Sequence, residues 1–282
     1  MESTIKKTAC ITGATSGIGA AFAKKLAEQG FDLIITGRRK EIIEAFANNL
    51  SNEYKVTVKV IIAELSDDER LDLLSKTVKE TENLEILVNN AGFNNKSYFH
   101  EEDISLYEKM IKVHNLALIR LCHCALPNMI SKGKGTIINV SSIAALVPVP
   151  VNSVYSASKS FVKIFSESIH LELKGTGVNV QALCPGMTIT DFHERIGFDR
   201  NTYYKNKGLM KAMTPEDVVE ISLQYIKKDK AICIPGKHNL LLSYLFKIVP
   251  QPLLYKMVSS IGSIKDKTST NSQTNTVQKK SE

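Results

Sequence analysis

Tyr155 and Lys159 lie four residues apart in the segment SVYSASKSFVKIF, residues 153–165. If this segment is helical, positions i and i+4 share a face, so the phenol and the ammonium point the same way. A phenol has a pKa near ~10, and lowering it by about 3 units needs ~4 kcal/mol in favour of the phenolate. An ammonium about 4 Å away supplies on the order of 4 kcal/mol at an effective dielectric constant of ~20. Such a pair would suit acid–base chemistry at Tyr155, but the spacing taken alone is more typical of a packed tyrosine beside a solvated lysine.

The elements that would position this pair alternate regularly along the chain. Seven short runs rich in Val and Ile predict strands, and most lack the polar alternation of half-exposed strands, as in a parallel sheet covered on both faces. These runs are residues 8–12, 32–36, 56–62, 84–89, 135–141, 178–184 and 231–235. Helical periodicity occupies residues 17–29, 39–50, 67–80, 104–130, 153–174 and 215–227. The alternation predicts an α/β fold: a doubly wound Rossmann-type parallel sheet of about seven strands flanked by helices.

The chain divides by composition into three parts. Residues 1–236 carry the alternation and predict one continuous domain without an internal linker. Residues 237–264 predict an apolar C-terminal helical extension, which Pro250 and Pro252 divide into two short helices. Residues 265–282 form a polar tail that we expect to be disordered.

Charge and cysteine usage exclude several classes of function. The net charge is +7, and seven lysines against two acidic residues in 237–282 account for +5 of it, so the domain itself has no nucleic-acid footprint. The five cysteines have neither a metal-ligand nor a disulfide-like spacing, and the chain begins without a signal-peptide pattern. We therefore expect a cytoplasmic protein without a metal site. None of the six histidines is assigned a role.

A glycine-rich turn follows the first predicted strand directly. The segment TGATSGIG, residues 12–19, spaces Gly13, Gly17 and Gly19 as G-x3-G-x-G, and a helical pattern opens at once. Such glycines let the backbone turn tightly and approach a pyrophosphate, which then lies on the helix N-terminus. A tight turn with close helix–strand packing is the alternative interpretation.

The glycine motif and four other motifs resemble those of the short-chain dehydrogenase/reductase family over about residues 5–235. NNAG (89–92) follows the fourth strand, INVSS (138–142) closes the fifth, YSASK (155–159) comes next, and PGMTIT (185–190) follows the sixth. Their order and their positions relative to the strands are those of the family. The resemblance implies a Rossmann-type fold and a nicotinamide dinucleotide cofactor.

The resemblance also implies four catalytic residues. Tyr155 would act as general acid/base, and Lys159 would be its partner and hold the ribose hydroxyls. Ser142 would donate a hydrogen bond to the substrate carbonyl oxygen, where charge grows as hydride arrives. Asn115, in KVHNLAL, matches the family position that holds a water between Lys159 and solvent.

The residues at the end of the second predicted strand indicate NADP(H) as the cofactor. An acidic side chain there would bind a ribose 2′-hydroxyl, but the segment TGRRK has Gly37, followed by Arg38 and Arg39, which suit a 2′-phosphate. Glu64 stands where many relatives have Asp beside the adenine, and Asn90 is the better candidate for lining the cofactor. The full set of expected cofactor-binding residues is Gly13, Thr15, Ser16, Gly17, Ile18, Gly19, Arg38, Arg39, Glu64, Asn90, Ala91, Gly92, Tyr155, Lys159, Pro185, Gly186, Thr188 and Thr190.

Together these features predict an NADP(H)-dependent oxidoreductase that interconverts a ketone and a secondary alcohol. Residues 191–213 lie where the family places a substrate lid, and their aromatic and methionine side chains suit a bulky hydrophobic substrate, steroid-like or acyl. Those side chains are Phe192, Phe198, Tyr203, Tyr204, Met210 and Met213. Two alternatives stay open: a 3-ketoacyl thioester reductase, and a non-catalytic NADP-binding sensor or scaffold, which would not need Tyr155.

We expect a homodimer or homotetramer. The C-terminal extension must bury its apolar side against something: the substrate cleft, a second subunit, or a membrane surface. Some steroid and ketoacyl reductases of the family carry comparable helices. A membrane contact would place basic side chains near anionic headgroups; the candidates are Lys237, Lys247, Lys256, Lys265 and Lys267.

Overall fold

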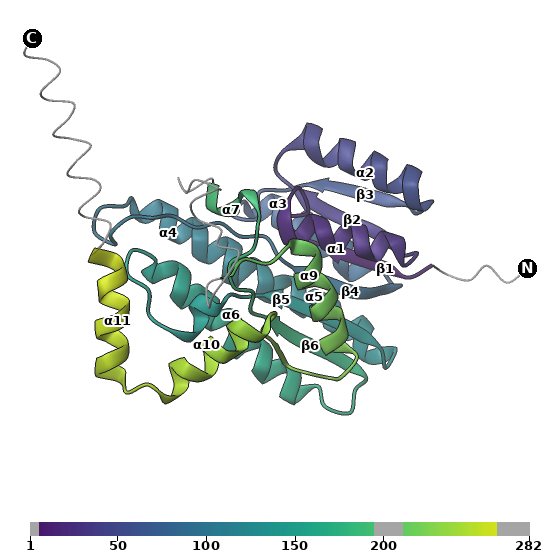
Figure 1. The fold of residues 1–282 in the computed structure, drawn as a ribbon. Coiled ribbons are helices and arrows are strands. Elements are labelled where there is room, and N and C mark those ends of the chain that lie inside the picture. The colour runs from purple at the N-terminus through teal and green to yellow at the C-terminus, as the bar shows by residue number, and fades with distance from the viewer. Residues whose placement is uncertain (1–5, 195–210, 264–282) are drawn as a thin grey trace, which may run out of the picture.

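A computed structural model describes residues 6–194 and 211–263. Seven strands form one parallel sheet in the order β3-β2-β1-β4-β5-β6-β7 (Figure 1). They are β1 (Thr8–Ile11), β2 (Asp32–Gly37), β3 (Val58–Ile62), β4 (Leu84–Asn89), β5 (Gly135–Val140), β6 (Val178–Leu183) and β7 (Ile232–Cys233). The order reverses between β1 and β4, which is where doubly wound sheets bind ligands. The predicted doubly wound α/β fold is confirmed.

Helices cover both faces of the sheet (Figure 1). One face packs on α1 (Gly17–Glu28), α2 (Lys40–Tyr54) and α9 (Pro215–Ile226), and the other on α3 (Asp68–Glu80), α5 (Ala117–Ser131) and α6 (Ser153–Glu172). The remaining described elements are α4 (Ile104–Ile111), the π-helix η1 (Lys112–Leu116), the 3-10 helix η2 (Ile143–Leu146), α7 (Asp191–Glu194), α10 (Lys237–Ile248) and α11 (Gln251–Ser263).

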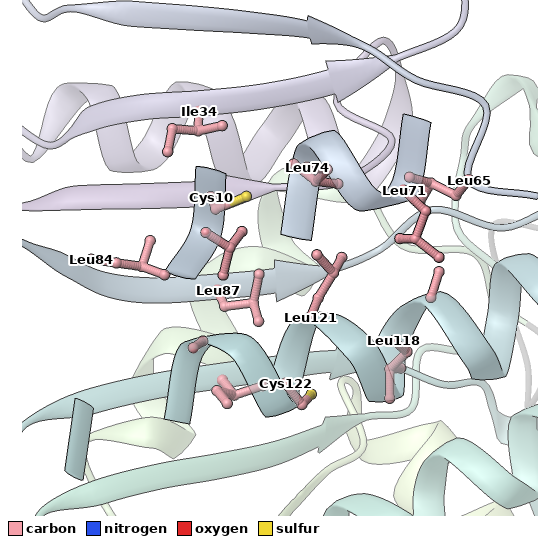
Figure 2. Close-up of a cluster of buried hydrophobic side chains, with 14 of the residues drawn as sticks. Cys10, Ile34, Leu65, Leu71, Leu74, Leu84, Leu87, Leu118, Leu121 and Cys122 are labelled. Atoms are coloured by element: carbon pink, nitrogen blue, oxygen red, sulfur yellow. The ribbon is translucent and has the colours of Figure 1, made fainter. Parts of the chain in front are cut away.

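Successive side chains of the central strands point to opposite faces of the sheet and so form two hydrophobic cores, one on each face. In β1, Cys10 points into the cluster against α3 and α5, while Ile11 points into the cluster on the opposite face. Figure 2 shows the first cluster, where Leu74, Leu87 and Leu121 meet between the sheet and its helices without solvent exposure. Burying each such side chain contributes about 1.5–3 kcal/mol. Both faces of β1 are covered, so its sequence reads as a continuous apolar run.

Three local features differ from the sequence prediction. β3 is an edge strand and exposes Lys59, so it is not buried on both faces. The last strand is only Ile232–Cys233. The single helix expected over 104–130 is interrupted by η1, because one extra residue enters the helical turn at Lys112–Leu116.

The C-terminal extension consists of α10 and α11, with Pro250 between them. Within residues 6–194 and 211–263, no helix combines the length and the apolar character that crossing a membrane requires. The division of the chain at residues 236 and 264 stays a prediction.

Candidate functional site

A cleft opens at the carboxyl edge of the sheet, where the loops after β1, β2, β3, β4, β5 and β6 converge. Its empty volume is about 1240 Å³, part of it open to solvent. Most of the expected residues line it: Gly13, Thr15, Ser16, Gly17, Ile18, Arg38, Glu64, Asn90, Ala91, Gly92, Ser142, Tyr155, Lys159, Pro185, Gly186, Thr188 and Thr190. Gly19, Arg39 and Asn115 are not among the lining residues. All these functional roles stay predictions.

The glycine turn after β1 is locked to the turn after β4. The Thr12 hydroxyl accepts the backbone N–H groups of Asn90 and Ala91 at 2.9 and 3.0 Å, and the Asn90 amide donates to the carbonyls of Thr12 and Gly13. Gly13 has φ +66°, and a Cβ there would lie 2.9 Å from the Ala91 Cα. Only glycine therefore lets the two turns approach this closely.

The N-terminus of α1 faces the cleft just beyond this turn. The helix is 12 residues long and carries no acidic side chain in its first turn, so nothing on it repels an anion. Gly17 has φ +57°, and a Cβ there would lie 2.8 Å from the Thr190 side chain. The cradle therefore fits a dinucleotide whose pyrophosphate lies on the helix end.

At the end of β2, cations surround one carboxylate. Arg38 donates to Glu64 at 3.0 Å, and Lys109 of α4 lies 3.2 Å from the same carboxylate oxygen. Partial burial alone would raise the pKa of Glu64, but hydrogen bonds and charge from the two cations outweigh it and hold the pKa below its usual value. Two cations against one anion leave this corner positive, as a phosphate needs. Arg39 turns aside and donates to the Thr15 hydroxyl at 3.0 Å.

The α6 helix presents Tyr155 and Lys159 to the cleft on one face, as their spacing predicted. The Lys159 side chain is buried, at 5% exposure; its Nζ lies 5.8 Å from the centre of the Tyr155 ring and donates to the Val140 carbonyl at 2.9 Å. Burial lowers the pKa of this ammonium to about 8. Ser142 begins η2, and its Oγ accepts the Ala144 N–H at 3.1 Å. That bond leaves the Ser142 hydroxyl proton available to an acceptor in the cleft.

Asn115 lies in η1, and the π-turn brings it against α6. Its amide donates to the Ser158 carbonyl at 3.0 Å, one residue before Lys159. Among the described residues, its buried Oδ1 has no hydrogen-bond partner. A buried carbonyl of this kind needs a water or ligand donor, which fits the water-holding role expected from the family.

Sequence reasoning missed His114, the neighbour of Asn115 in η1. The ring is 2% exposed and bridges two walls of the cleft: its Nε2 accepts the Phe93 N–H at 3.0 Å, and its Nδ1 lies 2.9 Å from the Ser158 Oγ. Ser158 in turn donates to the Tyr155 carbonyl. This chain requires a neutral imidazole with the proton on Nδ1. No spacing in the sequence points to it, because its partners lie 21 and 44 residues away.

Other lining residues escaped the sequence analysis because they are apolar or small. They are Thr36, Ala63, Leu65, Phe93, Val113, Val140 and Ser141. Phe192, from the expected substrate lid, lines the cleft 6.1 Å from the Tyr155 ring. Phe198, Tyr203, Tyr204 and Met210 lie outside the described residues.

The parallel sheet and this cleft define an α/β protein of the dinucleotide-binding class. A model of the short chain dehydrogenase family matches residues 7–201, most of the domain. The chain belongs to the short-chain dehydrogenase family, as the motifs predicted.

Individual proteins resemble the chain at moderate identity. A very-long-chain 3-oxoacyl-CoA reductase of Anas platyrhynchos is 37% identical over 202 residues, covering 69% of this chain and 64% of its own length, so the match spans less than two thirds of that relative. A sulfoacetaldehyde reductase of Chromohalobacter salexigens is 38% identical over 218 residues, covering 74% and 84%. A short-chain dehydrogenase from Sphingobium yanoikuyae in complex with NADPH superposes with a TM-score of 0.76 at 30% identity, covering 87% and 97%.

The His114 bridge predicts a pH dependence of stability. Burial, followed by the charge of Lys159, lowers the pKa of His114 well below its ordinary 6.5. The unfolded chain therefore binds the proton more readily, and stability from the neutral ring is complete above pH 6.5 and is lost as the pH falls through the folded pKa. The free energy of unfolding of the wild type, measured in urea, should fall below pH 6.5 by up to about 1.4 kcal/mol per pH unit because of this group.

In the variant His114→Asn, the free energy of unfolding should lack this contribution to its pH dependence. The control His123→Asn, on the exposed side of α5, should keep it. Equal slopes in the wild type and His114→Asn would contradict the buried neutral bridge.

Proposed function

We propose that the protein is an NADP(H)-dependent oxidoreductase that interconverts a ketone and a secondary alcohol. The observation that carries the proposal is that Ser142, Tyr155 and Lys159 line the same cleft as the glycine cradle and the N-terminus of α1. A sensor or scaffold protein would need the cradle but not the three polar groups beside it.

When bound, the nicotinamide supplies or accepts the hydride. In the reducing direction, the Tyr155 hydroxyl transfers its proton to the carbonyl oxygen as hydride reaches the carbonyl carbon, so the alcohol and the phenolate are the products of the step. The Ser142 hydroxyl donates a hydrogen bond to the same oxygen and stabilises the charge that develops on it. The reverse sequence oxidises the alcohol, with the phenolate as base.

Lys159 makes the phenolate accessible near neutral pH. With a pKa of about 8, its ammonium is still mostly protonated at pH 7, and an adjacent positive charge stabilises a phenolate over a phenol. Tyr155 must then be reprotonated from solvent. The unpaired Oδ1 of Asn115, on the segment that packs against Ser158, is suited to hold a water in that proton route.

The preference for NADP(H) over NAD(H) rests on the corner after β2. Arg38 lines the cleft and is 56% exposed on its side chain, so its guanidinium can reach a 2′-phosphate. Gly37 carries no acid, and a Cβ there would lie 2.6 Å from the Thr15 Cγ2, so an acidic side chain would have to displace Thr15. The solved relative bound to NADPH supports the same preference.

Arg38→Ala should therefore weaken NADPH binding by about 10–100-fold, because a charged hydrogen bond contributes about 1.5–3 kcal/mol. NADH binding should change far less. Fluorescence titration of both cofactors measures the difference. The control is Arg120→Ala, which removes an exposed guanidinium paired with Asp72 at 2.8 Å, away from the cleft. Equal losses for the two cofactors would refute the assignment.

Tyr155→Phe should bind NADPH as the wild type does but lose turnover by at least about 10²–10⁴-fold, because it lacks only the transferable proton. The measurement pairs NADPH titration with steady-state NADPH consumption. Tyr54→Phe, at the end of α2, is the control and should keep full activity. Wild-type turnover in Tyr155→Phe would place the acid elsewhere.

The substrate is proposed to be bulky and hydrophobic. Phe93 and Phe192 line the same cleft as Tyr155, and aromatic side chains in a binding cleft favour apolar substrates. The resemblance to a very-long-chain 3-oxoacyl-CoA reductase makes a 3-ketoacyl thioester the second candidate. The resemblance to a sulfoacetaldehyde reductase is the strongest reason to test small charged carbonyls as well.

In a panel of carbonyl compounds with NADPH, we expect kcat/KM to be at least tenfold higher for bicyclic or long-chain ketones than for a small keto acid, since each buried methylene contributes ~0.8 kcal/mol. Phe192→Ala should reduce the ratio of kcat/KM for the large ketones to kcat/KM for the small keto acid. The control Phe161→Ala, which changes an exposed residue of α6, should leave that ratio unchanged. Comparable efficiency on the small keto acid would refute the bulky-substrate proposal.

A further inference from the structure

The α10 helix buries two uncharged polar side chains against the protein and exposes a stripe of apolar side chains. Asn239 and Ser243 are 2% and 3% exposed. The outward stripe repeats at i, i+3, i+4 and i+7, the spacing of one helix face, and consists of Leu241, Tyr244, Leu245 and Ile248. A helix that hides serine and asparagine while exposing an isoleucine at 76% is suited to a contact outside the domain.

The α11 helix exposes apolar side chains as well. Leu254 is buried, while Leu253, Tyr255 and Met257 are about half exposed. Neither helix is among the elements that line the cofactor cleft, so the described part of the extension does not form the wall of the cleft. We call the seven exposed side chains the C-terminal apolar face: Leu241, Tyr244, Leu245, Ile248, Leu253, Tyr255 and Met257.

The charged side chains on the two helices all have one sign. The sequence has no Asp or Glu from Ala231 to Lys265, and Lys237, Lys247 and Lys256 are exposed on the two helices. Lysine stems can lie along an apolar contact while their ammonium groups reach a polar layer. Such a face complements an anionic surface whose interior is apolar.

The one-sided charge also argues against a second copy as the occupant. An isologous dimer through this face would bring the same acid-free, lysine-bearing surface against itself, and like charges without a partner oppose association. We propose that the C-terminal apolar face docks on an anionic lipid membrane surface, with α10 and α11 lying in the plane of the interface.

Docking there would be mechanically linked to the cofactor cleft. Asn239 anchors α10 by donating to the Pro235 carbonyl at 2.7 Å, and its amide packs against Gly186 so closely that a Cβ on Gly186 would lie 2.4 Å from the Asn239 Oδ1. Gly186 lines the cleft. The helix that would contact lipid is thus seated on the cleft wall, a geometry suited to an apolar substrate that dissolves in membranes.

The test is co-sedimentation of the full-length protein with vesicles of phosphatidylcholine alone and of phosphatidylcholine with about 30% phosphatidylserine. We expect binding to the anionic vesicles that decreases as salt rises toward ~1 M, because salt screens the lysines. Leu245→Gln/Ile248→Gln should weaken it at least tenfold without changing any charge. The control, Leu73→Gln/Leu171→Gln, alters two exposed leucines on α3 and α6 and should bind as the wild type does.

Circular dichroism and sedimentation velocity of each variant separate the outcomes. No binding to anionic vesicles by the wild type, or equal binding by Leu245→Gln/Ile248→Gln, would overturn the proposal. So would a wild-type dimer that the double variant converts to a monomer, because the face would then be a subunit interface. These readouts do not depend on catalysis, so they stand whether or not the proposed reaction is observed.

Discussion

The burial of one lysine ammonium constrains the rest of the site. Removing Lys159 from water disfavours its charged form and lowers its pKa to about 8. With that pKa the ammonium is still mostly protonated at pH 7, and it donates to the Val140 carbonyl at the end of β5 at 2.9 Å. The Ser141 hydroxyl, just past the end of β5, donates to the Lys159 backbone carbonyl at 2.7 Å. These two hydrogen bonds hold the end of β5 against α6, and they therefore fix where Tyr155 and Lys159 lie in the cleft.

A second network holds the other side of the cleft. Thr12 and Asn90 join the β1 and β4 turns, and His114 joins the loop at Phe93 to Ser158. Both networks bind backbone groups at strand ends, where the sheet supplies no ladder partner. Polar side chains thus provide hydrogen-bond partners for the backbone groups of the loops and at the same time fix the shape of the cleft. The glycines at the same points keep the walls close enough for these short bonds to form.

The cleft and the C-terminal helices carry positive charge in two different settings. The cleft carries its cations at the Arg38 and Lys109 corner, where a carboxylate partly compensates them. The C-terminal helices carry lysines with no acid between Ala231 and Lys265. Compensated charge is suited to binding one phosphate in a defined geometry, whereas uncompensated charge beside apolar side chains is suited to a diffuse anionic surface.

The sequence by itself determined the fold and most of the cleft. Seven apolar runs alternating with helical periods specify a doubly wound sheet, because strands covered on both faces leave a continuous apolar signal. The motifs at strand ends predict lining residues such as Gly13, Asn90 and Tyr155, because parallel strands bring their carboxyl ends to one edge. Only the tertiary structure decided the π-turn at Lys112–Leu116, the His114 bridge and the outward apolar stripe of α10. Each of these depends on partners distant in sequence: a helix spacing says which residues share a face, but packing decides which way that face points.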